Sequence, residues 1–365
     1  MKRLAATGLA LWFAAGAALA ADTVFQWRLP PGFPPPPVPA DNPMSAAKVF
    51  LGCRLFFDTR LSANGAYSCA SCHRPDLAFT DGRPQSIGVT GELTARGSMS
   101  LANLAYNTAY TWASDQAKTL ERQMATPLFN THPLEMGLAG RQDTLLQALR
   151  SSDADATAFR TAFPDSTDAI SMAHAIQAIA AFERTLISGR SAFDRYVFDD
   201  ERTALSASAR RGMALFFSPR AGCSECHSGL HFAAPGVFAN TGVHGQRAAA
   251  IGAGKSVADE SIDRGLMDVT GRAADLGKFR VPTLRNVALT APYMHDGSIA
   301  TLQAVIEHYA AIGTQREENP QLDAKLRPLV LDNGERADLV SFLESLSDPE
   351  FASGANLPCR AGLGQ

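Results

Sequence analysis

Two copies of one short motif place residues able to carry redox chemistry in this 365-residue sequence. The spacing is Cys-x-x-Cys-His, with Cys69, Cys72 and His73 in the first copy and Cys223, Cys226 and His227 in the second. In this spacing the two thiols can add to the vinyl groups of a haem while the histidine binds its iron. A zinc site would need Cys-x-x-Cys pairs that converge on one metal, and a dithiol redox site would need a βαβ frame. The sequence therefore predicts two covalently bound haems c.

The second axial position of each iron decides what that haem can do. An iron with two protein ligands transfers electrons, whereas an iron with an open face can react with peroxide or oxygen. No histidine lies between His73 and His132, and Met99 and Met124 are the only methionines in that interval. We therefore expect the first haem to be open, with capture by one of these methionines as the alternative.

The second haem has several possible axial ligands downstream of its motif. They are Met267, Tyr293, Met294, His295, His308 and Tyr309. Spacing alone does not distinguish between them.

The sequence repeats itself around the two motifs, which indicates a duplication. Gly52-x-x-Leu-Phe-Phe57 precedes the first motif and Gly212-x-x-Leu-Phe-Phe217 precedes the second, each with the apolar spacing of a helix. Each half then ends in a helical pattern, at 173–187 and at 335–346, and alternating strand patterns are rare. We expect a mainly α protein made of two cytochrome c-like domains with long loops.

The N-terminus has the features of a secretory signal. Lys2 and Arg3 are followed by a short apolar run and by Ala18-Leu-Ala20, which predicts cleavage and a periplasmic protein. The alternative, a membrane anchor, would need a longer apolar run. The expected segments are a signal peptide at 1–21, a proline-rich arm at 22–43, the first haem domain at 44–190, a linker at 191–205, the second haem domain at 206–350 and a tail at 351–365.

Two cysteines remain outside the motifs, Cys53 and Cys359. Disulfides persist in the periplasm, so we expect these two to pair and to tie the tail to the helix that opens the first domain. The alternative is two unpaired buried thiols. A net charge of -3 with 19% charged residues provides no basic stripe, so no nucleic-acid partner is expected. No segment after the N-terminal run is apolar enough to cross a membrane.

The segment 281–297, which reads Val-Pro-Thr-Leu-Arg-Asn-Val-Ala-Leu-Thr-Ala-Pro-Tyr-Met-His-Asp-Gly, resembles the bacterial di-haem cytochrome c peroxidase family. So does the run from Leu61 to the first motif, and the resemblance covers nearly all of the chain beyond the signal peptide. It implies two haems c and a reaction with hydrogen peroxide. The family's methionine ligand of the second haem matches Tyr309 here, and a histidine of its peroxidases matches Val89.

Both departures resemble the MauG branch of this family. Its members form a high-valent state shared by two irons and oxidise aromatic residues of a partner protein. A phenolate stabilises ferric iron, whereas a thioether favours ferrous iron. The resemblance therefore implies that Tyr309 binds the second haem and that the first haem stays open.

The resemblance also implies roles for residues between the motifs. Trp112 would relay electrons between the haems, and Glu135 would move the protons of peroxide. Gln123 and Pro127 would line the same pocket as Glu135. His132 is a rival acid-base residue, with a surface position as its alternative. The alternative for both Trp112 and Tyr309 is an ordinary structural position with no role in the reaction.

A calcium ion between the haems is implied as well. The family's backbone carbonyl ligands match Thr290 and Pro292, but its asparagine ligand falls near Gly97, which has no side-chain oxygen. Within the MauG branch, the proline-rich arm and the region 68–82 resemble the methanobactin-associated di-haem enzymes, the MbnH group. Those enzymes are implicated in oxidising a tryptophan of a copper-binding partner, MbnP, to kynurenine.

We therefore expect a peroxide-dependent oxidoreductase that oxidises an aromatic residue of a protein partner at a distance. The first alternative is a di-haem cytochrome c peroxidase that reduces peroxide with electrons from a small redox protein. The second is an electron carrier without enzymatic activity, which would need both irons six-coordinate.

Overall fold

The structure is a computed structural model that describes residues 25–243, 263–317 and 319–360. The predicted signal peptide, 1–21, lies outside these ranges. The α-helices are α1 (Ala46–Phe56), α2 (Cys69–Cys72), α3 (Leu120–Gln123), α4 (Ala125–Phe129), α5 (Gln142–Arg150), α6 (Asp153–Ala162), α7 (Met172–Glu183), α8 (Ala192–Phe198), α9 (Ala207–Phe216), α11 (Met267–Thr270), α12 (Leu302–Ile312), α13 (Asn333–Glu344) and α14 (Pro349–Ala352). One short antiparallel pair joins β1 (Phe238–Ala239) to β2 (Phe279–Arg280).

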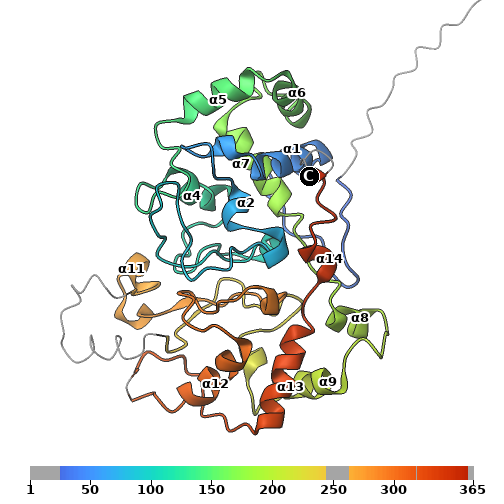
Figure 1. The fold of residues 1–365 in the computed structure, drawn as a ribbon, viewed down its shortest axis with the longest axis vertical. Helices are drawn as coiled ribbons and strands as arrows, with labels where there is room; N and C mark the ends of the chain where they lie inside the picture. The colour runs from blue at the N-terminus through green and yellow to red at the C-terminus, as the bar shows by residue number, and fades with distance from the viewer. Residues whose placement is uncertain (1–24, 244–262, 318, 361–365) are drawn as a thin grey trace, which may run out of the picture.

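Each half is built on one crossed pair of helices, α1 with α7 and α9 with α13 (Figure 1). A glycine stands at each crossing. A Cβ atom on Gly52 would lie 1.9 Å from the carbonyl oxygen of Ala178, and one on Gly212 would lie 1.9 Å from that of Asp338. Only glycine lets the backbones approach this closely. The two crossings are therefore equivalent, as the duplicated sequence predicts.

Side-chain caps explain where these helices begin. Ser45 accepts a hydrogen bond from the third residue of α1, and Ser171 and Ser206 do the same for α7 and α9. Asp332 and Glu335 form a reciprocal capping box at α13. Such caps satisfy backbone N–H groups that would otherwise have no partner in the first turn.

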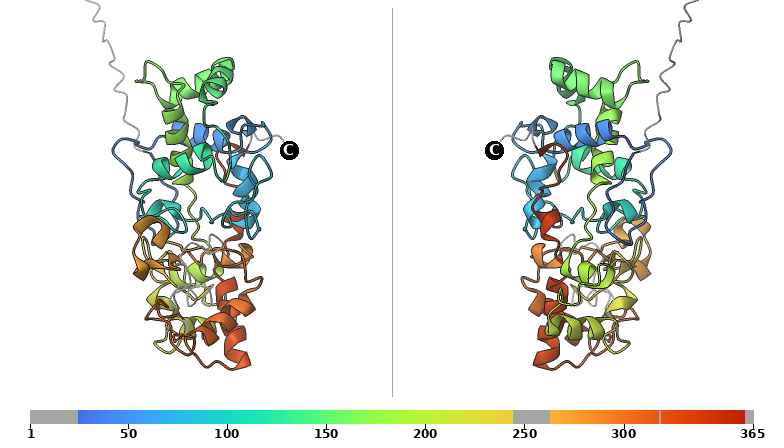
Figure 2. Two further views of the ribbon diagram at one scale, coloured as in Figure 1. Left: turned by 90° about the vertical axis from the view of Figure 1, so that its left-hand side faces the viewer. Right: turned by 90° about the vertical axis from the view of Figure 1, so that its right-hand side faces the viewer.

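Two hydrophobic cores follow from the two helix pairs. Phe56, Phe159 and Phe182 lie in the first core, and Phe216 and Phe342 lie in the second. Both side views in Figure 2 show the first half above the second along the long axis. The prediction of a mainly helical protein with two cytochrome c-like domains and long loops is confirmed.

The stretch expected as a linker, 191–205, contains a helix. It holds α8, and both Phe193 and Leu205 are buried in the second core. This stretch is therefore packed into the second half and is not a bare connection, because its apolar side chains can be buried there.

The two halves meet at a buried junction of four residues, Asn103, Asn286, Ser188 and Asp348. Asn103 exchanges two hydrogen bonds of 2.9 Å with the backbone of Ser188. Asn286, the equivalent of Asn103 in the second half, accepts a hydrogen bond of 2.8 Å from the backbone N–H of Asp348. The halves are also linked directly, because the Ser188 hydroxyl donates to Asp348 Oδ2 at 3.1 Å and accepts from Asn286 Nδ2 at 3.0 Å.

The described part of the proline-rich arm, 25–43, contains no helix or strand. Its Phe33 is 7% exposed and contacts both halves. The ring lies 6.4 Å from the ring of Tyr106 in the first half, 5.5 Å from the ring of His231 in the second, and 4.9 Å from the guanidinium of Arg285. The arm therefore packs across the boundary between the two halves.

The C-terminal segment returns to the first half. After α14 the chain reaches Cys359, which forms a disulfide with Cys53 on α1 across 5.7 Å between the Cα atoms. Both cysteines are buried in the first core. Within the described ranges, the helices are too short or too polar to cross a membrane.

Candidate haem sites

The four motif cysteines are half-buried, and none of them is in a disulfide. Cys69 begins α2 and packs against the first core, whereas Cys223 packs against the second. Burial raises the pKa of Cys69 to about 12 and that of Cys223 to about 11, so both are protonated thiols at neutral pH. Thiols held in this way are suited to covalent attachment of a haem.

His73 and His227 are held by equivalent hydrogen bonds. Nδ1 of His73 donates to the carbonyl of Phe79 at 2.8 Å, and Nδ1 of His227 donates to that of Phe232 at 3.2 Å. Burial lowers the pKa of both imidazoles, which favours the neutral form. In a neutral ring with Nδ1 protonated, Nε2 carries the lone pair that a metal binds. Both histidines could therefore bind a metal through Nε2.

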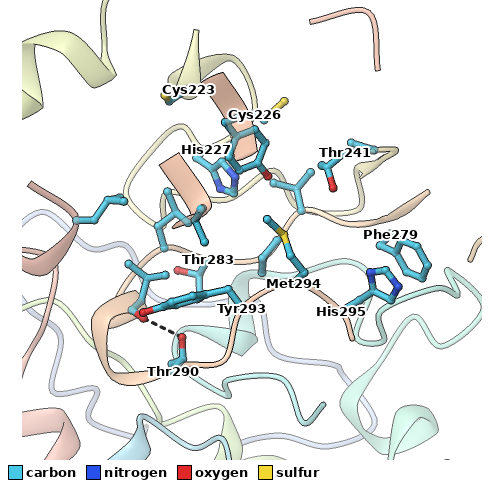
Figure 3. A pocket seen from close by; sticks show the side chains of 18 of the residues that line it. Cys223, Cys226, His227, Thr241, Phe279, Thr283, Thr290, Tyr293, Met294 and His295 are labelled. Atoms are coloured by element: carbon cyan, nitrogen blue, oxygen red, sulfur yellow. Dashed lines mark hydrogen bonds between the residues drawn. The ribbon is translucent and has the colours of Figure 1, made fainter. Parts of the chain in front are cut away.

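A cavity adjoins the second motif, with Cys223, Cys226 and His227 on one side of it (Figure 3). Much of the remaining wall is apolar, and includes Phe216, Val281, Leu284, Val287, Leu302, Ile306, Leu339 and Leu343. Two thiols, one histidine and an apolar wall are the donor set and the surroundings that a haem c requires.

Tyr309 on α12 lines this cavity and is half-buried. Burial, followed by the nearby thiols of Cys226 and Cys223, raises the pKa of its phenol well above the usual range. A hydrogen bond to Thr241 acts in the opposite direction. The phenol is therefore neutral unless a cation such as ferric iron stabilises the phenolate.

The structure separates the other possible ligands of the second haem. His308 donates from Nε2 to the Thr241 carbonyl at 2.8 Å, and Met267 does not line the cavity. His295 stacks on Phe279 with ring centroids 3.5 Å apart, as Figure 3 shows. Of the remaining candidates, Tyr293 and Met294 line the cavity, as Tyr309 does.

Glu135 lies near the first motif, on a loop that begins with a cis peptide bond at His132–Pro133. Burial raises the pKa of its carboxyl. Its charge, after burial and Asp81, helps to raise the pKa of the Cys72 thiol to about 11. His132, the rival acid-base residue, is exposed.

The other residues expected near Glu135 come from α3 and α4. Gln123 ends α3, and Pro127 of α4 accepts a backbone hydrogen bond from Met136 at 3.0 Å. Val89 also borders this loop, because its N–H donates to the carbonyl of Glu135 at 3.0 Å. The position at which the family's peroxidases have a histidine therefore borders the first site and carries no ligand atom.

The two methionines that could close the first haem have different environments. Met124 is 3% exposed and belongs to the first core. Met99 lines the cavity beside the second motif, and its sulfur accepts a hydrogen bond from Arg280 at 3.2 Å.

A second carboxyl group near the first motif had no predicted role. Glu183 is 7% exposed at the end of α7, and its Oε2 has no hydrogen-bond partner. Burial raises its pKa to about 8, and its charge in turn raises the pKa of Cys69. The equivalent helix crossings place Leu343, which lines the second cavity, at the matching position. The only sequence signal was this acid at the place of a leucine in the repeat.

Trp112 lies where the halves meet and lines the same cavity. Its indole N–H donates to the carbonyl of Gly97 at 2.9 Å, and its own carbonyl accepts from the backbone of Arg280 at 2.7 Å. These bonds join a loop of the first half to β2 of the second. The indole is thereby fixed at the interface of the two halves.

Thr290 and Pro292 line this cavity too, as does Gly97. Their carbonyl oxygens are donors of the type that calcium prefers. Among the described residues, no cluster of three or more His, Cys, Asp or Glu side chains could hold a metal ion. Any calcium here would therefore depend on carbonyls and water.

Comparisons with known proteins agree with this geometry. A family model described as di-haem cytochrome c peroxidase matches residues 46–202. The methylamine utilization protein MauG of Methylorubrum extorquens is 36% identical over 323 residues, which are 88% of this chain and 84% of the relative. The cytochrome-c peroxidase IdrP1 of Denitromonas iodatirespirans is 38% identical over 374 residues, which are 96% of this chain and 95% of the relative.

A solved structure, of a MauG-like protein associated with microbial copper homeostasis, has the same fold. It is 38% identical, with a TM-score of 0.81, and the match covers 92% of this chain and 98% of that one. The similarity therefore extends over both halves.

Proposed function

Because the chain belongs to the family of di-haem cytochrome c peroxidases and MauG proteins, we propose that it is a periplasmic oxidoreductase with a protein substrate. Hydrogen peroxide reacts at the first haem, and an aromatic residue of the partner, a tryptophan that becomes kynurenine, is oxidised at a distance. The observation that carries this proposal is Tyr309, a half-buried phenol on the wall of the cavity beside the second motif.

The first half supplies the peroxide site. The two haems c, when bound, provide the iron chemistry that reduces peroxide and stores its oxidising equivalents. Val89 leaves the side opposite His73 without a histidine ligand. Glu135, whose carboxyl is partly desolvated, takes a proton from one peroxide oxygen and delivers it to the other. Burial, which raises the pKa of this carboxyl, makes it a better proton acceptor than an exposed glutamate.

The second half holds the oxidising equivalents in this proposal. His227 and Tyr309 would hold the iron of the second haem, and a phenolate ligand would stabilise the oxidised iron, whereas a thioether would favour the reduced iron. The low-dielectric wall of the cavity strengthens this effect, because little water can compete with the phenolate.

Trp112 connects the two sites. Its indole donates a hydrogen bond to Gly97 of the first half, and its backbone carbonyl accepts one from Arg280 of the second, so the indole can pass an electron without a large change of position. Peroxide is small enough to enter a buried site that excludes a protein side chain. The partner therefore donates its electrons at the surface, and they reach the irons through the protein.

Similarity to a MauG-like protein associated with microbial copper homeostasis supports a copper-binding, MbnP-like partner. The proline-rich arm supports the same subgroup. Thr290 and Pro292 support a calcium ion between the haems, because their carbonyls share the cavity with residues of both halves.

The test is low-temperature electron paramagnetic resonance of the ferric protein, before and after one equivalent of peroxide, on wild type and Tyr309→Phe. We expect one high-spin and one low-spin haem, loss of both ferric signals with peroxide, and a changed low-spin signal in the variant. A tryptophan-to-kynurenine mass change in a copper-binding partner would then identify the substrate.

Two other outcomes are informative. If the low-spin signal is the same in wild type and in Tyr309→Phe, the ligand of the second haem would instead be Tyr293 or Met294. Two low-spin haems that do not respond to peroxide would mean an electron carrier.

Similarity to IdrP1 favours one alternative function, reduction of peroxide with electrons from a small redox protein. Rapid turnover with a reduced small cytochrome would support that alternative.

A further inference from the structure

Among the described residues, one buried cation on the wall of the cavity has no carboxylate as a counter-ion. Arg280 on β2 is 4% exposed and lines the cavity that adjoins the second motif. Its Nε has no hydrogen-bond partner, and Nη2 donates to the sulfur of Met99 at 3.2 Å. A thioether is a weak acceptor and carries no charge. The guanidinium is therefore removed from water without a matching anion.

Two other buried arginines each have a carboxylate partner. Arg184 binds both carboxylate oxygens of Glu121, at 2.7 and 2.9 Å. Arg285 binds both carboxylate oxygens of Asp194, at 2.8 and 2.9 Å. Among the described residues, no carboxylate forms an ion pair with Arg280, so it differs from both.

The acidic residues that line the same cavity are engaged elsewhere. Asp81 accepts from the hydroxyl of Ser98 at 3.1 Å, and Asp323 accepts from the backbone of Lys325 at 3.0 Å. Burial lowers the pKa of Arg280 to about 10, which still leaves the guanidinium charged at neutral pH. A buried charge of this kind is strongly unfavourable unless an anion and hydrogen bonds compensate it.

We propose that Arg280 binds a propionate carboxylate of the second haem and thereby raises the reduction potential of that haem. A planar guanidinium with Nε unoccupied can bind a carboxylate through two parallel hydrogen bonds. The haem attached at Cys223 and Cys226 occupies the cavity that Arg280 lines, so its propionates are the available anions. The proposal rests on haem binding by the family and does not depend on which partner is oxidised.

The experiment is spectroelectrochemistry of the holoenzyme, without peroxide or partner, on wild type, Arg280→Gln and Arg280→Lys. Loss of the positive charge should lower the potential of the second haem in the glutamine variant, and lysine should restore much of it. The low-spin resonance signal should shift in the glutamine variant. Arg83→Gln is the control for the second haem, because Arg83 lines the same cavity but is exposed, and its loss should leave the potential of that haem unchanged.

Three results would overturn the proposal. The first is a second-haem potential that is unchanged in both Arg280 variants. The second is a shift confined to the first haem. The third is a wild-type potential that changes with phosphate concentration at constant ionic strength, which would mean that a free anion occupies the site. If the glutamine variant fails to fold, the lysine variant and the phosphate titration still test whether Arg280 binds a propionate.

Discussion

Glu183 makes the two haem sites chemically different. The first half has this carboxylic acid at the end of α7, where the second half has Leu343 on its cavity wall. The acid is buried beside Cys69, and one of its oxygens has no partner. Arg184 on the same helix lowers the pKa of Glu183, and Glu121 on α3 raises it, but burial is the larger effect.

Replacing Glu183 by glutamine should change how stability depends on pH. The pKa is about 8 in the folded protein, against an ordinary value of 4.5, so between these values the folded state binds more protons than the unfolded state. The free energy of unfolding therefore falls as pH rises through this window, by an amount on the order of a few kcal/mol. Glu183→Gln should remove that fall, which denaturant titrations at several pH values would measure.

Glu344→Gln provides the control, because this glutamate is exposed at the end of α13. It should leave the pH dependence unchanged. An equal fall of stability with pH in wild type and Glu183→Gln would mean that the carboxyl is solvated in the holoprotein.

Some of this residue chemistry was predictable and some was not. The proximal role of His73 follows from its motif, because attachment and ligation depend on local spacing. The unusual states of Glu183 and Arg280 depend on which side chains the folded chain leaves without partners. No local pattern carries that information.

At the scale of elements, the backbones of α1 and α7 approach closely where the two helices cross at Gly52. A methyl group there would lie 1.9 Å from the Ala178 carbonyl oxygen, so the helices would have to separate. Gly52→Ala should therefore reduce the free energy of unfolding by about 1–3 kcal/mol in chemical denaturation. Gly212→Ala should have a similar effect at the equivalent crossing.

Gly334→Ala is the matched control within a helix. Its added methyl would lie 3.2 Å from Oδ1 of Asp332, a contact that a shift of a few tenths of an ångström would relieve. Alanine also has the higher helix propensity, so stability should stay the same or rise by up to about 1 kcal/mol. A Gly52→Ala protein as stable as wild type would show that the crossing tolerates expansion.

The helices were predicted more accurately than their ends. The patterns predicted helices at 173–187 and 335–346, whereas α7 and α13 end at Glu183 and Glu344. After these ends, Asn103 and Asn286 bind the backbone of the following turns. Those partners come from distant parts of the sequence, so the apolar periodicity alone could not show that the helices stop early.

At the scale of the whole molecule, the proline-rich arm covers the boundary between the two halves. Phe33→Ala would remove contacts with both halves at once, and a buried phenylalanine contributes about 3 kcal/mol or more. We expect a lower Tm and faster proteolytic cleavage within the arm. Val38→Ala, at an exposed position of the same arm, should change neither. Equal cleavage rates in Phe33→Ala and wild type would show that the arm is released independently of this ring.

The buried junction of Asn103, Asn286, Ser188 and Asp348 determines how far apart the two redox centres stand. Each haem is attached to its own half, and rotating one half against the other would leave several of these buried groups without hydrogen bonds. The rate of electron tunnelling falls steeply with separation. We therefore expect a junction that resists rotation to keep this rate nearly constant during the reaction.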